Sequence, residues 1–135
     1  VAAPVGLVSL ASTFASIAGM QRPDYTESER LPLNDDDARL LGHERVLTEW
    51  DSVLFGKIVG ARTICRDGWV CTAMLPGTVH DGTEGELYDL ANDPLQRNNL
   101  WSSSQHVAQR DALLDDMWSS LPTRVLPLRA CDAPV

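Results

Sequence analysis

The stretch that decides the fold is GELYDLANDPLQRNNLW, residues 85–101. It joins a strand-like run over residues 86–90 to an Asn92-Asp93-Pro94 turn, and it continues as a polar segment that ends at Leu100-Trp101. Strand alternation would place Leu87 and Leu90 on different sides, and the turn residues stop the run. The stretch therefore predicts a strand that ends in a tight turn.

Two segments before this stretch also have strand patterns. Residues 45–52, RVLTEWDS, alternate apolar and polar side chains with a period of two. Residues 61–75, ARTICRDGWVCTAML, predict a hairpin, because Asp67-Gly68 supplies the positive φ angles that a tight hairpin turn requires. Together with residues 85–90, these segments predict an antiparallel sheet of three or four strands.

Helical spacing is found at both ends of the chain. The first segment predicts an amphipathic helix over residues 5–18 that ends at Gly19, and its apolar stripe is Leu7, Leu10, Ala11, Phe14, Ile17 and Ala18. The last segment predicts a helix that covers one face of the sheet and ends before Pro122. Its apolar face is predicted to contain Val107, Leu114, Trp118 and Leu121, with Met117 beside them.

These elements predict the α+β class, with a small antiparallel sheet packed against a C-terminal helix. One amphipathic helix, residues 1–20, and an acidic loop or linker, residues 21–44, precede a subdomain over residues 45–135. We expect the acidic run of residues 34–37 to be a solvated surface, with a metal site of adjacent carboxylates as the alternative.

Bulk properties exclude some classes of function. The chain has 135 residues, a formal net charge of −8 and a pI near 4.6, which argues against nucleic-acid binding. No apolar run approaches the roughly 18 residues of a membrane span. Three cysteines lack C-x-x-C spacing, so we expect buried thiols, and their odd number gives only a weak indication of the cytoplasm.

Two pairs of polar residues are candidates for a substrate pocket. His80 and Asp81 lie in a loop, PGTVHDGTEG, where loop groups often carry function. Glu49 and Asp51 share one face of a predicted strand and could bind a cation or a sugar hydroxyl. The alternatives are a plain surface histidine in the loop, and charge pairing of the two carboxylates with Arg62 or Arg66 on a neighbouring strand.

One short match to a catalytic pattern lies near the C-terminus. Residues 120–124, SLPTR, fit S-x-P-x-R, which resembles the sulfatase nucleophile motif in which a Cys or Ser becomes formylglycine. That chemistry needs the N-terminus of a helix, where amides and dipole favour an anion. Ser120 is predicted at a helix C-terminus, so we interpret the match as coincidence.

The opening stretch resembles the C-terminal signature of the sulfatase family, of the arylsulfatase and sulfamidase kind, in the alkaline-phosphatase-like superfamily. The family pattern is roughly E-L-Y-D-L-x-x-D-P-x-E-x-x-N-L, although Gln96 or Arg97 replaces the usual acidic residue. Two more segments resemble the family, in the same order along the chain. Residues 3–20 are similar to a family helix, with Ser9 and Ser12 where Asp and Pro are common. Residues 61–75 are similar to a family hairpin. The signature is matched by Glu86, Leu87, Tyr88, Asp89, Leu90, Asp93, Pro94, Asn99 and Leu100.

The resemblance implies a C-terminal portion of a sulfuric ester hydrolase whose N-terminal catalytic domain, in the same polypeptide, holds formylglycine and calcium and binds the sulfate-ester substrate. Residues 1–20 would then belong to the large α/β domain, and their apolar face would be exposed, or repacked on the small sheet, without it. The chain lacks a credible nucleophile and a metal-ligand set, so we predict no catalysis by it alone. His80, Asp81, Glu49 and Asp51 stay the pocket candidates on chemistry and position.

Two other classes of function remain open from the sequence. A related enzyme of phosphate or phosphonate esters would have a similar C-terminal portion, and only its nucleophile motif would distinguish it. A stand-alone, non-enzymatic binding module could use the same small sheet.

Overall fold

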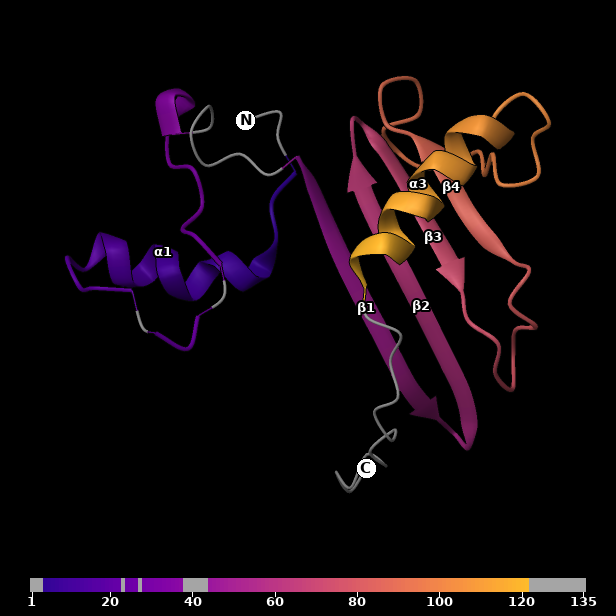
Figure 1. The fold of residues 1–135 in the computed structure, drawn as a ribbon, viewed down its shortest axis with the longest axis horizontal. Helices are drawn as coiled ribbons and strands as arrows, with labels where there is room; N and C mark the ends of the chain where they lie inside the picture. The colour runs from indigo at the N-terminus through magenta and orange to yellow at the C-terminus, as the bar shows by residue number, and fades with distance from the viewer. Residues whose placement is uncertain (1–3, 23, 27, 38–43, 122–135) are drawn as a thin grey trace. The chain divides into compact units, whose positions relative to one another are not determined.

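The computed structural model describes residues 4–22, 24–26, 28–37 and 44–121. These residues divide into two compact units, within 1–46 and within 47–135. The fold is α+β, as predicted (Figure 1). The elements are a short 3-10 helix, Leu7–Ser9, followed by α1 (Leu10–Ile17), β1 (Arg45–Leu54), β2 (Lys57–Arg66), β3 (Trp69–Met74), β4 (Gly85–Asp89) and α3 (Val107–Ser120).

The four strands form one antiparallel sheet in the order β1-β2-β3-β4, so that every strand pairs with its neighbour in sequence (Figure 1). Cys71 lies at the centre of the sheet, opposite Ile64 on β2 and Leu87 on β4. The sequence predicted a sheet of three or four strands, and the structure has four. The segment of residues 85–90 supplies β4, one edge of the sheet.

Two tight turns connect the first three strands. Asp67 and Gly68 have φ angles of 52° and 78°, which confirms the predicted hairpin between β2 and β3. Phe55 and Gly56 have φ angles of 51° and 76° and connect β1 to β2 in the same way. The sequence did not predict this second turn, because a bulky Phe is unusual at positive φ. Strands β1 and β2 are consequently longer than the predicted segments.

Helix α3 covers one face of the sheet, as predicted, but with a different side of the helix. Leu113 and Met117 are the buried residues of α3, whereas Val107 and Trp118 are exposed. The predicted face is therefore wrong for these two residues, although Leu114 and Leu121 do pack on the core. The core of this unit consists of Ile64, Cys71, Ala73, Leu87, Leu113 and Met117.

In the first unit, α1 turns its polar side inward. Ser12 and Thr13 are buried, and both are hydrogen-bonded to the segment that follows the helix. The Ser12 hydroxyl donates to Ser28 O over 2.6 Å, and Leu31 N–H donates to Thr13 Oγ1 over 2.8 Å. The chain after α1 thus folds back along the polar side of the helix.

The apolar stripe of the first unit faces outward. Leu7 is 83% exposed, Phe14 64% and Ile17 65%, and three more apolar side chains beside them are also exposed: Val5, Val8 and Met20. The predicted helical spacing is confirmed, with a 3-10 turn before α1 and Gly19 at positive φ after it. We call these six residues the outward face of α1.

The acidic run is only partly a solvated surface. Asp35 and Asp36 are exposed, as expected. Asp37 instead accepts two hydrogen bonds from Arg30, of 2.6 and 2.8 Å, and its N–H donates to Asn34 Oδ1. The Arg30 guanidinium holds the pKa of Asp37 below its usual range, and Leu33 N–H adds to this effect. Asp37 therefore fixes the loop around Arg30.

Candidate functional site

The first candidate site is a cluster of charges on β1 and β2. Arg62 is nearly buried, with 6% of its side chain exposed. Its Nη1 and Nη2 atoms donate to the two carboxylate oxygens of Asp51 over 2.9 and 3.0 Å, and its Nε lies 3.1 Å from Glu49 Oε2. This geometry is the two-pronged pairing that arginine makes best with a carboxylate.

The cluster decides between the two interpretations of these carboxylates. Pairing with Arg62 is confirmed, whereas Arg66 instead contacts Asp67 and Asp116. A substrate would have to compete with a buried guanidinium for Glu49 and Asp51. In this chain, both carboxylates connect β1 to β2 through Arg62.

The second candidate site is the loop between β3 and β4. His80 Nδ1 lies 3.5 Å from Glu84 Oε1, and the Glu84 carboxylate accepts the Asp81 N–H over 3.1 Å. Asp81 Oδ1 accepts both the N–H and the hydroxyl of Thr83, and these bonds lower the pKa of Asp81. The loop is thus shaped by hydrogen bonds to its own two carboxylates, Asp81 and Glu84.

The two candidate sites approach each other at the base of the loop. A Cβ atom at Gly60 would lie 3.0 Å from Asp51 Oδ1 and 3.1 Å from Leu75 Cδ1, so a glycine lets the loop and the cluster come together. The contacts described for His80 and Asp81 are with Glu84 and Thr83, whereas those of Glu49 and Asp51 are with Arg62. The role of all four residues in a substrate pocket stays a prediction.

The signature segment uses its polar side chains to cover the free edge of β4. Asn99 Oδ1 accepts the N–H groups of Leu87 and Trp101 over 3.0 and 2.9 Å, and its amide donates to Gly85 O over 3.0 Å. Leu100 N–H adds a bond to Leu87 O. The asparagine thus takes the place of a fifth strand, a role that the sequence pattern alone did not reveal.

The two acidic residues of the same segment shape its turns. Asp89 accepts hydrogen bonds from the Asn92 side chain over 2.6 Å and from the Ala91 N–H over 3.0 Å, and the Asn92 bond in particular lowers the pKa of Asp89. Asp93 Oδ2 accepts the Asn98 N–H over 2.8 Å. Both carboxylates therefore serve as local caps of the backbone.

Trp101 closes the segment over Gly85. A Cβ atom at Gly85 would overlap the Trp101 ring and lie 2.5 Å from Thr72 O, so only glycine fits there. The Trp101 indole N–H donates to Thr83 O over 3.1 Å, and the Arg110 guanidinium lies 5.3 Å from the ring centroid. Trp101 therefore joins the signature stretch to the loop before β4 and to α3.

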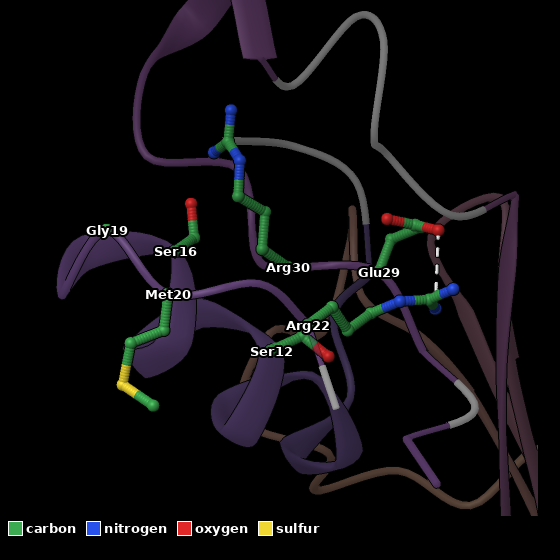
Figure 2. Close-up of a pocket in the computed structure, with 7 residues that line it drawn as sticks. All are labelled: Ser12, Ser16, Gly19, Met20, Arg22, Glu29 and Arg30. Atoms are coloured by element: carbon green, nitrogen blue, oxygen red, sulfur yellow. Dashed lines mark ion pairs between the residues drawn. The ribbon is translucent and has the colours of Figure 1, made fainter. Parts of the chain in front are cut away.

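The first unit contains a cavity of about 480 Å³ (Figure 2). Its two guanidinium groups are both paired: Arg22 with Glu29 at 3.4 Å, and Arg30 with Asp37. Paired charges leave no excess of positive charge for an anion. The cavity is lined by Ser12, Ser16, Gly19, Met20, Arg22, Glu29 and Arg30.

The described residues do not fit the two groups that sulfatase chemistry needs. No cluster of three or more His, Cys, Asp or Glu residues suited to a metal ion occurs among them. Ser120 is the last residue of α3, and its hydroxyl donates to Asp116 O over 2.9 Å, at the negative end of the helix dipole. The remainder of the S-x-P-x-R match, residues 122–124, lies outside the described residues. None of the described helices has the length and apolarity needed to cross a bilayer.

Of the comparisons with known proteins, only the comparison with solved structures gives matches. No protein-family model and no curated protein sequence matches the chain. Solved structures do match. A candidate sulfatase from Bacteroides thetaiotaomicron is 25% identical with a TM-score of 0.59, and the 2-O GAG sulfatase BT1596 is 27% identical with a TM-score of 0.61. The chain has the fold of a sulfatase segment.

The covered lengths fit a C-terminal portion of a sulfatase. The matches include 88% and 90% of this chain, but the chain spans only 27% of each of those two sulfatases. A third structure, BT4656 in complex with its substrate D-glucosamine-2-N,6-O-disulfate, shares the fold at 16% identity, with a TM-score of 0.60 and coverage of 82% of this chain and 22% of that one. The predicted resemblance to sulfatases is confirmed by this fold.

Proposed function

We propose that this chain is the C-terminal portion of a sulfatase-like hydrolase of sulfuric esters, and that its own role is structural. The observation that carries this proposal is the use of Asp89, Asp93 and Asn99, the polar residues of the signature, in hydrogen bonds to the chain's own segment. Side chains that saturate local backbone groups are unavailable for bond cleavage. The similarity to sulfatase structures supports the choice of family.

The partner of the chain in this proposal is the larger catalytic domain of the same polypeptide. The outward face of α1 supports this, because six apolar side chains within residues 5–20 are exposed, and soluble proteins normally cover apolar surface of that extent. The polar side of α1 is already occupied by its own loop, so the outward face is the side left for that domain. Residues 1–20 would then act as the attachment.

Formylglycine and calcium would reside in that catalytic domain, together with most contacts to the sulfate ester. In this chain, the loop of His80 and Asp81 is the part proposed to reach the mouth of the substrate pocket. Glu49 and Asp51 would act there through Arg62, as supports for the loop base beside Gly60.

Two measurements test the proposal. The purified chain, assayed with calcium and 4-nitrophenyl sulfate, should show no hydrolysis above the rate of buffer. The DNA upstream of the Val1 codon should encode an in-frame extension with an Asp-Asp pair and Cys-x-Pro-x-Arg. Turnover by the chain alone would disprove the structural role, and a start codon directly before Val1 would disprove the larger polypeptide.

The extended protein then tests the attachment. Phe14→Glu should lower the yield of soluble, active enzyme, since it places a charge in the proposed contact. Ala112→Glu adds the same charge on an exposed position of α3 and serves as the control. Equal yields for the two variants would contradict docking through the outward face of α1.

A further inference from the structure

The two faces of the sheet differ in what covers them. Residues opposite each other in neighbouring strands point to the same side, so Ile64, Cys71 and Leu87 share one face. Helix α3 packs on this face through Leu113 and Met117. Among residues 47–121, α3 is the only helix, and Figure 1 shows it on one side of the sheet. The described part of this unit therefore leaves the other face without a covering helix.

The strand register gives the side chains of that other face. Thr63 lies opposite Thr72, and Val70 lies between Cys65 and Tyr88 on the two neighbouring strands. These positions are one residue out of step with the pairs under α3, so their side chains point away from the helix. We name six residues the open face: Ala61, Thr63, Cys65, Val70, Thr72 and Tyr88.

The open face has the composition of a covered surface. The side of an antiparallel sheet that meets water normally has charged or strongly polar side chains. Strand β3, with the sequence WVCTAM, has no charged residue on either side, and Glu86 on the edge strand β4 is the charged neighbour of Thr72. The Thr63 and Thr72 hydroxyls are hydrogen-bonded to each other over 2.9 Å. Because this pair shares one bond already, covering it costs less than covering two separate hydroxyls.

An aromatic side chain lies at the margin of the open face. Glu49 and Asp51 contact Arg62 on the side that α3 covers. Because side chains alternate along a strand, Trp50 between the two carboxylates points to the side of the open face, where it is 52% exposed. Trp and Tyr are enriched at the centres of protein interfaces. Trp50 on β1 and Tyr88 on β4 thus lie on the two edge strands of a surface suited to another protein domain.

We propose that the open face and Trp50 dock on the catalytic domain of the same polypeptide, as a second contact in addition to the outward face of α1. This inference rests on the proposed function, in which that domain exists. The chain spans only 27% of each of two sulfatases with this fold. Most of the proposed polypeptide therefore lies outside this chain and could supply the covering surface.

The small area of the open face argues against a second copy of the chain as the occupant. Ala61 and Thr72 are only 8% and 9% exposed, and the other four residues are half-buried. Two separate molecules lose translational and rotational freedom on association, and little apolar area is left here to offset that loss. A domain on the same polypeptide is held nearby at high effective concentration, so the same area suffices.

The test follows the alkylation of Cys65 by N-ethylmaleimide in the 135-residue chain and in the extended protein, with peptide mass spectrometry to assign each cysteine. Cys131 is replaced by Ser in both proteins. Burial raises the pKa of the Cys65 thiol, so labelling is run at mildly alkaline pH. Cys71, fully buried under α3, is the internal reference for unfolding. We expect Cys65 to react at least about tenfold more slowly in the extended protein, because the catalytic domain covers it.

Trp50→Lys separates docking from folding. Lysine is well tolerated on an edge strand, so the melting temperature of the 135-residue chain should stay close to that of the unsubstituted chain. In the extended protein, the same variant should restore fast labelling of Cys65 and lower sulfatase activity, since it places a charge in the proposed contact. Trp118→Lys changes an exposed aromatic residue on α3 and is the matched control, with no effect on labelling.

Three results would overturn the inference. They are equal labelling of Cys65 in the chain and the extended protein, an equal effect of Trp118→Lys, and labelling of the 135-residue chain that slows as its concentration rises. The last result would identify a second copy as the occupant. Failure of the proposed function is read separately, from the absence of an in-frame extension upstream of Val1, and would remove both proposals. Fast labelling of Cys65 in an existing extended protein would remove only this one.

Discussion

Arg62 and Asp51 face each other across β2 and β1 through two parallel hydrogen bonds, of 2.9 and 3.0 Å. The guanidinium is almost excluded from water, and Glu49 contacts its third nitrogen. One cation therefore balances two carboxylates at the place where the edge strand β1 joins the sheet.

Removal of Arg62 should destabilise the sheet strongly. Arg62→Ala leaves two partly buried carboxylates side by side, and we expect a loss of about 2 kcal/mol in the free energy of unfolding, reduced from a fully buried case by the exposure of Glu49. Arg62→Lys keeps the charge without the two-pronged geometry and should lose less. Urea unfolding measures both, and an Arg62→Ala variant as stable as the unsubstituted chain would contradict the role given to the cluster.

Asn99 should matter more for folding than for any chemistry. Asn99→Ala removes two hydrogen bonds at the edge of β4 and one to the Trp101 N–H, and we expect a loss of about 2 kcal/mol in unfolding free energy. Asn98→Ala changes the neighbouring exposed side chain and is the matched control. Amide exchange of Leu87 should accelerate in the Asn99 variant only. Unchanged protection of Leu87 would show that the asparagine does not act as the missing strand.

The isolated chain should self-associate through the outward face of α1. Six exposed apolar side chains within residues 5–20 favour burial against a second copy at high concentration. In sedimentation experiments, the average mass should rise with concentration, and Ile17→Lys should abolish that rise. Ala112→Lys, on α3, tests for a general effect of charge. Association that persists in the Ile17 variant would assign it to another surface.

The pair of Arg30 and Asp37 should make the first unit sensitive to acid. Since the folded pKa of Asp37 is lowered, the unfolded chain binds the proton more readily. The contribution of the carboxylate to stability is therefore complete above about pH 3.9 and is lost as the pH falls through the lower, folded pKa. Carbon NMR of the Asp37 carboxyl should give a midpoint that rises in Arg30→Gln but not in Arg22→Gln. A midpoint unaffected by Arg30→Gln would exclude the pairing in solution.

The sequence predicted those features that depend on local spacing. Asp67-Gly68 identified one hairpin because these residues accept positive φ at little cost, and strand alternation predicted that Glu49 and Asp51 share a face with a cation opposite. The Phe55-Gly56 turn escaped prediction, because nothing in its side chain favours the backbone conformation it adopts. Turn prediction relies on the residues that favour positive φ, so a turn with a bulky residue at positive φ is missed.

The spacing of apolar residues could not predict which side of each helix is buried. The stripe of α1 was located correctly, but a helical period cannot say whether its apolar side meets the same chain or water. For α3, several apolar residues were available, and contact with Ile64 and Leu87 on the sheet selected Leu113 and Met117. The role of Asn99 also required the structure, since a side chain that completes a sheet edge leaves no periodic signal.

The strand order β1-β2-β3-β4 has a consequence for how this part of the molecule forms. Each strand pairs with the one before it through a turn of two residues or, between β3 and β4, through the loop of residues 75–84, so most sheet contacts join residues close in sequence. Closing a short connection costs little conformational entropy, so the contacts of each strand pair offset that cost early. Low contact order also correlates with rapid folding. The sheet should thus form by successive zipping of hairpins, with the docking of α3 as the slower, final step.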